Sequence, residues 1–250
     1  MRAARPLLDY DAEAGAYDAT RGGVPRAEAA AAAVLGLLPD PARTLLDLGC
    51  GTGIVTARLT RPGLTVLGAD TSYGMASTAA RRGVRTVLAS GSRLPLRPAC
   101  LDAVSAVWLL HLLRGPGAVA ELVAEAGRVL RPGGVLVTTV DKDAAHDVGS
   151  DIDALLAPHL TTGPADASHE VEAYAARAGL RPDRETRFTG HGQGRTPRST
   201  AADLLAGRYA SRISPRGTTA ALLAARLAEL PGQDAPRAEP TYRVRSFVRG

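Results

Sequence analysis

Apolar and polar positions follow a β/α repeat along the first 140 residues. Short apolar runs predict strands at 43–49, 64–70, 84–90, 102–110 and 135–140. Segments with helical spacing of apolar residues predict helices before and between them, at 27–38, 53–60, 72–83 and 117–130. This alternation predicts a parallel sheet with helices on both faces. The run at 102–110 is almost continuously apolar, as expected of a strand that is buried on both sides.

The pattern is looser after Asp141. Helical spacing predicts four more helices, at 151–156, 168–180, 201–210 and 218–230. Two alternating segments predict a sixth strand at 181–188 and a closing strand at 241–250. The glycine- and proline-rich piece at 189–197 is expected to be a loop or a lid.

Composition and charge narrow the class of protein. Apolar residues make up 45% of the 250 positions, which is ordinary for a globular chain, and no stretch is long and apolar enough for a membrane span. An acidic residue within the first ten positions argues against a secretory signal, and Cys50 and Cys100 form neither a disulfide framework nor a metal cluster. We therefore expect a cytoplasmic protein. The net charge of +5 comes from scattered arginines, with Lys142 as the single lysine, so nucleic acid is not the expected partner.

The stretch LLDLGCGTG, residues 45–53, carries the first chemical signal. A dinucleotide fingerprint spaces its glycines as G-x-G-x-x-G and holds pyrophosphate at a helix start. Here Gly49, Gly51 and Gly53 are spaced as G-x-G-x-G, so the third glycine comes one residue earlier than in the fingerprint. Asp47 precedes them at the end of the strand. Because a carboxylate facing the turn would repel a diphosphate, the turn favours a ligand with a positive centre and no phosphate.

A second carboxylate ends the next predicted strand. Asp70 lies 17 residues after Gly53, where an acidic side chain can accept hydrogen bonds from two ribose hydroxyls. The two carboxylates and the glycine turn together indicate an adenosyl ligand that lacks phosphate. An NAD-dependent oxidoreductase, the rival enzyme class, does not fit the glycine spacing or Asp47.

Five segments in this order resemble the class I S-adenosylmethionine-dependent methyltransferases, close to their ubiquinone-biosynthesis-like small-molecule group. They are LLDLGCGTG (45–53), VLGADTSYGM (66–75), GSRLPL (91–96), LDAVSAVWLLHLL (101–113) and RVLRPGGVLV (128–137). The resemblance covers residues 9–140 and the rest only in layout. It implies an α/β fold with a Rossmann-like, doubly wound, mostly parallel seven-stranded sheet, an N-terminal helical lid and a helical insertion before the last strand.

The resemblance also implies how the single domain, 1–250, is divided. Residues 1–40 would be the lid and first helix, 41–140 the cofactor-binding core, and 141–250 the acceptor side. The cofactor would be S-adenosylmethionine, with S-adenosylhomocysteine as product. Its implied binding residues are Tyr17, Arg21, Asp47, Gly49, Cys50, Gly51, Gly53, Asp70, Thr71, Met75, Ser90, Gly91, Ser92 and Trp108.

Several of these residues have implied roles. Asp70 would bind the ribose hydroxyls, and Met75 would pack on adenine. In the lid, residues 9–23, Tyr17 would cover the cofactor and Arg21 would approach its methionine carboxylate; the alternative is a surface helix with two half-buried tyrosines. The sequence departs from the family where an acidic residue usually takes the adenine amino group, because Ser90 stands there. Ser90, Ser92 or a backbone group would have to replace it.

The residues that would bind the methyl acceptor are harder to predict from the sequence, because methyl transfer needs a base only when the acceptor must lose a proton. His111 follows the fourth predicted strand, and it is either a catalytic base or a histidine that ties down the loop. Trp108 would wall the pocket or belong to the core. His146, His169 and His191 lie in the variable half, and each taken singly is expected at the surface. Of the three, His191 in the glycine-rich loop is the leading candidate for a functional role.

Motifs that the sequence lacks limit the classes of molecule that could accept the methyl group. Asp141, Lys142 and Asp143 are expected to form a solvated loop. Trp108 and Leu109 stand where metal-dependent relatives need an acidic residue, so no metal is expected. The segment VWLLHLL lacks the Asn/Asp-Pro-Pro-aromatic run of amino-group methylators of nucleic acids, and Cys100 follows alanine, not the proline of the cytosine methylators. A single lysine excludes the two-lysine ribose methylators.

We therefore expect methyl transfer to O, N or C of a small molecule, in secondary metabolism. The alternatives are a nucleic-acid or protein methyltransferase, or a cofactor-binding homologue without methyl transfer. Expected partners are the small-molecule acceptor alone, with no membrane. The acceptor's identity and the choice between monomer and homodimer stay open.

Overall fold

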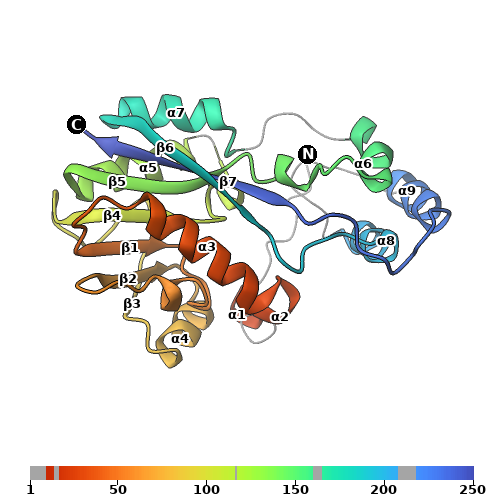
Figure 1. Ribbon diagram of the computed structural model, residues 1–250, viewed down its shortest axis with the longest axis horizontal. Helices are drawn as coiled ribbons and strands as arrows, with labels where there is room; N and C mark the ends of the chain where they lie inside the picture. Colours follow the sequence, from red (N-terminus) through yellow and green to blue (C-terminus); the bar gives the residue numbers. More distant parts are fainter. Residues whose placement is uncertain (1–9, 14–16, 116, 160–164, 208–217) are drawn as a thin grey trace.

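A computed structural model describes residues 10–13, 17–115, 117–159, 165–207 and 218–250 of the chain (Figure 1). Its centre is a seven-stranded sheet in the order β3-β2-β1-β4-β5-β7-β6. The strands are β1 (Thr44–Leu48), β2 (Thr65–Asp70), β3 (Thr86–Leu88), β4 (Leu101–Ala106), β5 (Leu130–Val140), β6 (Leu180–Thr189) and β7 (Thr241–Arg249). Strand β7 runs antiparallel to both of its neighbours, β5 and β6, whereas the pairs from β3 to β5 are parallel. The predicted mostly parallel, seven-stranded sheet is confirmed.

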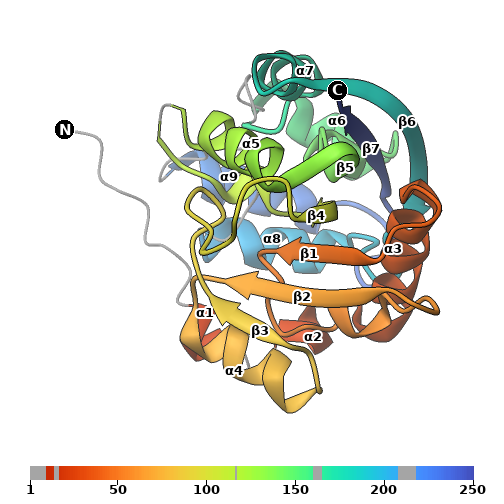
Figure 2. The ribbon, with the colours of Figure 1, turned by 90° about the vertical axis from the view of Figure 1, so that its left-hand side faces the viewer.

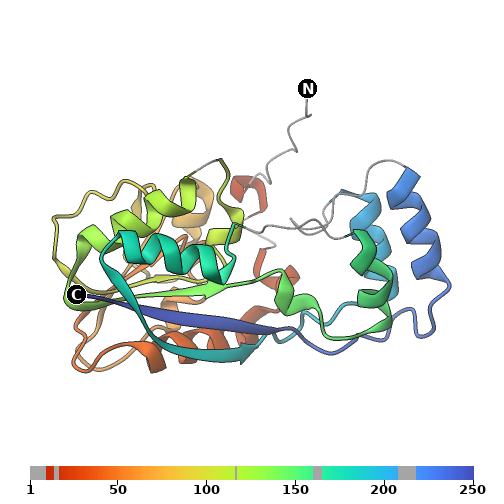
Figure 3. The same ribbon diagram turned by 90° about the horizontal axis from the view of Figure 1, so that it is seen from above.

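Helices cover both faces of this sheet (Figures 2 and 3). On one face α3 (Gly23–Leu37) packs its Ala30, Val34 and Leu37 against apolar side chains of β1, β5 and β7. On the other face lie α5 (Ala118–Val129) and α7 (Ser168–Arg177), which share a second core with the same strands. Helix α4 (Tyr73–Arg81) flanks β2 and β3. Apolar stripes at helical spacing, each buried against the sheet, account for these positions.

Three helices lie apart from the sheet, beyond the carboxyl ends of its parallel strands (Figure 3). They are α6 (Asp151–Leu156), α8 (Pro197–Leu205) and α9 (Thr218–Ala228), which share a small core of their own. Two very short helices, α1 (Tyr10–Glu13) and α2 (Tyr17–Thr20), precede α3. Four 3₁₀ turns complete the described elements: η1 (Thr56–Arg58), η2 (Leu110–Leu112), η3 (Ala144–His146) and η4 (Ala157–His159). Among the described residues, no helix has the length and apolar character that crossing a bilayer requires.

Two predicted elements are wrong. The helix expected at 53–60 is only the single turn η1. Its sequence offers the β-branched run Ile54, Val55 and Thr56, which disfavours a helix, and Pro62 and Gly63 end the segment soon after. The strand expected at 102–110 stops at Ala106, because the chain turns at Trp108, whose φ is +54°.

Other boundaries shift by a few residues. Helix α3 begins four residues before the expected start, β3 is shorter than the run at 84–90, and β5 extends back to Leu130. Helix α8 starts at Pro197, earlier than the expected 201–210, and residues 208–210 of that prediction lie outside the described part. Thr196 caps α8, since its hydroxyl accepts from the Ser199 N–H at 3.0 Å, and proline suits the first helical position.

Candidate active site

A cavity of about 440 Å³ opens at the carboxyl ends of β1, β2 and β4. Its wall combines the glycine turn after β1, the β2–α4 junction, the turn after β4 and the N-terminal helices. In open α/β sheets ligands bind where the strand order reverses. Here that point lies between β1 and β4, so the cavity occupies the expected position.

The glycine turn leaves open space beside this cavity. Gly51 has a φ of +56°, and a Cβ built on it would meet no atom within 4 Å, which leaves room for a ligand against the backbone. Gly53 has a φ of +75°, and a Cβ there would come within 2.8 Å of the Cβ of Ala79 in α4. Both positions therefore require glycine, the first for an approach to the backbone and the second for close packing of the turn.

Asp70 closes the turn from the end of β2. Its Oδ2 accepts a hydrogen bond from the Gly51 N–H at 2.8 Å, and its Oδ1 accepts one from the Ser72 N–H at 2.9 Å. Each carboxylate oxygen can accept a further hydrogen bond. Asp70 lines the cavity, so hydroxyls of a ligand could donate to it there.

Asp47 lies deeper, at the end of β1. Its two oxygens accept hydrogen bonds from the Thr56 hydroxyl at 2.6 Å and the Ser105 hydroxyl at 2.7 Å. Burial raises the pKa of Asp47 to about 6, against the opposing effect of those two hydroxyls. No basic side chain stands in the turn or at the β2–α4 junction, from Asp47 to Gly53 and from Asp70 to Met75. These two carboxylates suit an adenosyl ligand and would oppose a diphosphate.

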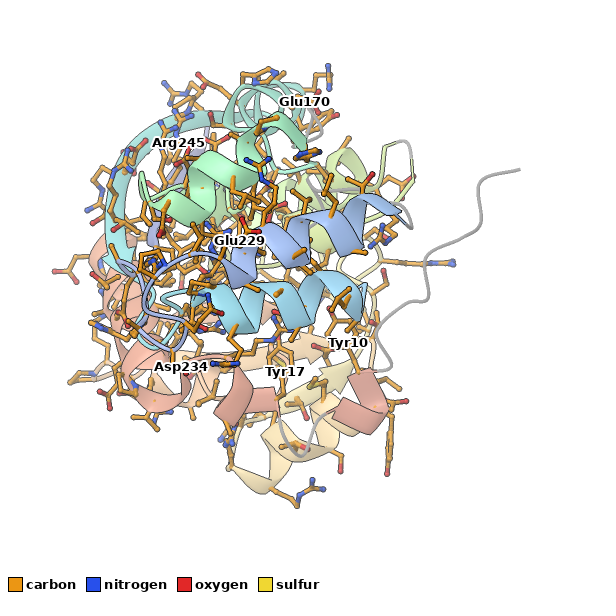
Figure 4. All side chains as sticks on the ribbon, turned by 90° about the vertical axis from the view of Figure 1, so that its right-hand side faces the viewer. Tyr10, Tyr17, Glu170, Glu229, Asp234 and Arg245 are labelled. Atoms are coloured by element: carbon orange, nitrogen blue, oxygen red, sulfur yellow. The ribbon has the colours of Figure 1, made fainter. Side chains whose placement is uncertain are left out.

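The N-terminal helices are fastened to the same loops. Asp11 of α1 accepts from the Ser72 hydroxyl at 2.5 Å and from the Gly74 N–H at 2.8 Å, at the start of α4. Asp18 of α2 accepts from the Thr52 hydroxyl at 2.6 Å. Figure 4 shows Tyr10 and Tyr17 close together, with ring centres 6.3 Å apart, and both rings line the cavity.

Trp108 forms the wall at the end of β4. Its left-handed backbone is uncommon for a large side chain, and its backbone N–H donates to the Thr139 hydroxyl at 2.8 Å. The guanidinium carbon of Arg26 lies 3.8 Å from the centre of the indole ring. Phe188 and Tyr242 meet the same ring edge-on, each with a centre-to-centre distance of 5.3 Å. This turn carries Leu109 over Gly49, where a Cβ would lie 2.7 Å from a leucine methyl.

Two histidines lie mostly buried near Lys142. Burial, followed by the charge of Lys142, lowers the pKa of both His111 and His146 to about 3, so both rings are neutral at physiological pH. The Nε2 atom of His146 lies 3.2 Å from the Tyr242 hydroxyl. The Nδ1 atom of His111 is buried and has no hydrogen-bond partner among the described residues.

The expectation of a solvated loop at 141–143 is wrong. Asp143 is buried, and its carboxylate accepts a hydrogen bond from the Lys142 ammonium at 3.2 Å. Asp141 accepts from the Ser168 N–H at 2.9 Å and pairs with Arg243. Asp166, just ahead of α7, covers this run, since its carbonyl oxygen accepts from the Asp141 N–H at 2.9 Å and its carboxylate from the Lys142 N–H at 2.8 Å. Surface positions do hold for His169, which is exposed, and for His191, which pairs with Glu239. The surface position expected for His146 is wrong, because its ring is mostly buried beside Tyr242.

Most of the residues predicted from the sequence come together at the cavity. Those that line it are Tyr17, Asp47, Gly49, Cys50, Gly51, Asp70, Thr71, Met75, Ser90, Gly91, Ser92 and Trp108. Three others lie outside the lining: Arg21 is exposed beside the Tyr17 ring, Gly53 packs on α4, and His111 is the middle residue of the η2 turn. The hydroxyls of Ser90 and Ser92 lie 3.1 Å apart, and both residues are exposed.

The sequence reading missed several lining residues, above all Tyr10, Arg26 and Ser72. A signal for Arg26 exists, because it falls on the apolar stripe of α3 with Ala30, Val34 and Leu37, where a charged residue is out of place. Apolar lining residues from η2 and α5 carry no chemical signal. In the described part of the chain, no group of three or more His, Cys, Asp or Glu side chains could hold a metal ion.

A family model described as a methyltransferase domain matches residues 46–138. This part of the chain is similar to a methyltransferase domain. The resemblance to class I S-adenosylmethionine-dependent methyltransferases is thereby confirmed. A demethylmenaquinone methyltransferase of Corynebacterium kroppenstedtii is 37% identical over 98 residues, which are 39% of this chain and 42% of that relative. The match thus spans less than half of the relative's length, and it fits the quinone-biosynthesis group.

Two solved structures share the fold over nearly the whole chain. The [4+2]-cyclase SpnF has a TM-score of 0.61 at 19% identity, over 96% of this chain and 94% of its own. A geranyl diphosphate C-methyltransferase of Streptomyces coelicolor, in complex with Mg²⁺, geranyl diphosphate and S-adenosylhomocysteine, has a TM-score of 0.53 at 17% identity, over 99% and 86%. At these identities the likeness concerns the fold alone.

Proposed function

We propose that this chain binds S-adenosylmethionine in the cavity at the ends of β1, β2 and β4, and transfers its methyl group to a small molecule. The observation that carries the proposal is the glycine turn closed by Asp70, with a second carboxylate, Asp47, at its base. The match to a methyltransferase domain supports it. The two methyltransferases named above, whose names specify demethylmenaquinone and geranyl diphosphate, support a small-molecule acceptor.

The residues of this chain would hold and shield the cofactor. Asp70 would accept hydrogen bonds from the ribose hydroxyls, Met75 would pack on adenine, and Tyr17 would cover the site. When bound, S-adenosylmethionine supplies a methyl group activated by its sulfonium sulfur, and the thioether S-adenosylhomocysteine is a good leaving group. The protein's main contribution would then be to align the nucleophile with that methyl and to exclude water. Transfer to an O, N or C atom of the acceptor, and a role of the reaction in secondary metabolism, are predictions.

The cofactor proposal is tested by calorimetry with S-adenosylhomocysteine and NAD. We expect micromolar binding of S-adenosylhomocysteine and no detectable binding of NAD. Binding of NAD without binding of S-adenosylhomocysteine would overturn the assignment. Methyl transfer itself is tested by release of S-adenosylhomocysteine from S-adenosylmethionine in the presence of candidate acceptors.

A second candidate is a cofactor-binding homologue that does not transfer methyl groups. It is favoured by the fold shared with a [4+2]-cyclase, because one fold can host different reactions. Tight binding of S-adenosylmethionine without release of S-adenosylhomocysteine, together with a changed acceptor skeleton, would support this candidate.

A further inference from the structure

Arg26 is a buried cation in the wall of the cavity. Only 8% of its surface is exposed, and it lies on the apolar stripe of α3 among alanines and Val34. Its guanidinium stacks on Trp108, 3.8 Å from the ring centre. It forms no hydrogen bond and no ion pair with any residue that the structure describes.

A guanidinium in this position lacks the partner that burial normally demands. Arginine stays protonated in proteins and presents five N–H donors, and an unpaired buried charge is strongly unfavourable. Burial is the main influence on Arg26 and lowers its pKa, and among the nearby groups Tyr242, Tyr17 and Asp18 oppose this while Arg21 adds to it. Asp18 is the acidic group among them, and it is already engaged by Thr52 and Arg82. An anion in the cavity would supply the missing acceptor.

The position of Arg26 separates it from the adenosine half of the site. Asp70 and Met75 come from β2 and α4, whereas Arg26 stacks on Trp108 at the end of β4, which in turn contacts Phe188 of β6 and Tyr242 of β7. Strand β1 lies between these two groups in the sheet. A ligand whose adenosine lies over β1 and β2 therefore leaves the Arg26 side of the cavity for a second molecule.

Stacking also fixes the orientation in which Arg26 could bind. An indole against one face of the guanidinium holds its plane, while the N–H edge stays available for a two-point contact with a planar anion. Carboxylates match this fork with two parallel hydrogen bonds. Lysine lacks that geometry, so the site favours arginine specifically.

We propose that Arg26 binds a carboxylate group of the methyl acceptor, so that the acceptor is a small carboxylic acid. This inference rests on the proposed function, because it takes the cavity to hold S-adenosylmethionine beside the acceptor. Arg26 then selects the substrate and positions it toward the methyl group, without taking part in the transfer.

The test compares acids with their uncharged amides. With S-adenosylhomocysteine at saturation, calorimetry measures binding of benzoate, 4-hydroxybenzoate, indole-3-acetate and decanoate, and of the four matching primary amides. We expect at least one acid to bind about tenfold or more tightly than its amide, as charge-assisted hydrogen bonds require. If no acid is preferred over its amide, the proposal is overturned.

Variants separate Arg26 from general charge effects. Arg26→Gln should remove the preference for the acid and leave the affinity for S-adenosylhomocysteine within about threefold, and Arg26→Lys should restore only part of the preference. Arg97→Gln is the matched control, because Arg97 is exposed and outside the cavity lining. Melting curves verify that each variant is folded.

Two failures remain distinguishable. If Arg26→Gln weakens S-adenosylhomocysteine at least as strongly as the acid, Arg26 serves the carboxylate of the cofactor and the inference is wrong. If the wild-type protein binds no S-adenosylhomocysteine, the proposed function itself fails, and the first titration reveals this before any acid is added.

Discussion

Asp70 combines two tasks at the scale of a single residue. Its carboxylate accepts from the N–H groups of Gly51 and Ser72, and it also faces the cavity. Asp70→Ala should weaken S-adenosylhomocysteine binding by about 2–4 kcal/mol, because charge-assisted hydrogen bonds are lost. Asp70→Asn keeps one acceptor oxygen and should lose less. Calorimetry measures both, and Asp234→Ala, at an exposed carboxylate, is the control. An unchanged affinity in Asp70→Ala would refute the placement of the ribose.

His111 offers a choice between base and packing residue. As a base, its removal in His111→Ala should lower the transfer rate by about 10²- to 10⁴-fold with folding intact. We expect instead a lower melting temperature and a rate within about tenfold of wild type, because His111 is mostly buried and lies outside the cavity lining. His169→Ala, at an exposed histidine, is the control.

The pH profile tests whether a group other than His111 controls the rate. Burial lowers the pKa of His111 to about 3, so its ring stays neutral from pH 8 to pH 5. A wild-type rate that falls through pH 6.5 would therefore report some other group. A stable His111→Ala variant with a rate loss of 10²-fold or more would establish the base role instead.

Residue-level prediction succeeds where spacing along the chain encodes the chemistry. Gly51 and Asp70 are recognisable because a turn and a strand end fix their positions, and both line the cavity. Arg26 and Trp108 come together only through the fold, since their contact joins α3 to the turn after β4. Sequence spacing carries no record of that contact.

At the scale of elements, α1 and α2 should respond to the cofactor. Asp11 and Asp18 fasten them to the loops that would surround S-adenosylmethionine, so ligand binding should slow amide exchange in both helices. Hydrogen exchange with and without S-adenosylhomocysteine measures this, and α7, on the face of the sheet opposite α3, serves as the internal control. Equal protection in both states would return these helices to the role of a plain surface segment.

Elements were predictable where burial is regular along the segment. Strands β1 and β2 and helix α5 match their periodic patterns closely. The helix expected at 53–60 failed because Thr56 turns toward Asp47 and helix-breaking residues follow, so local chemistry outweighed the apolar spacing. The strand expected to continue to residue 110 failed at Trp108, where tertiary contacts hold an unusual backbone.

At the scale of the whole molecule, the buried histidines should govern stability in mild acid. His111 and His146 have their pKa lowered to about 3, so below pH 6.5 the unfolded chain takes up protons that the folded protein cannot, and stability falls. Asp47 and Asp166 act in the opposite direction, because burial raises the pKa of each to about 6 and the folded protein then binds protons more tightly. The pKa of each histidine moves further from its ordinary value than the pKa of each aspartate, so the net effect of acidification is a loss of stability.

Melting curves between pH 7 and pH 5 check this balance. We expect the melting temperature of the wild-type protein to fall over that interval, and His146→Gln to flatten the decline because it removes one of the two opposing histidines. His169→Gln is the matched control, since His169 is exposed. A variant that follows the wild-type curve throughout would contradict the contribution of His146.

The position of β7 has a consequence for biosynthesis. Because β7 is inserted between β5 and β6, neither neighbour can complete its pairing until residues 241–249 have left the ribosome. At about 5–20 residues per second, the roughly 100 residues that separate β5 from β7 take about 5–20 s to translate. Throughout that interval the nascent chain presents β5 as an open edge, to which a neighbouring polypeptide could add a strand. Chaperone demand during translation should therefore peak after β5 emerges and end when β7 does.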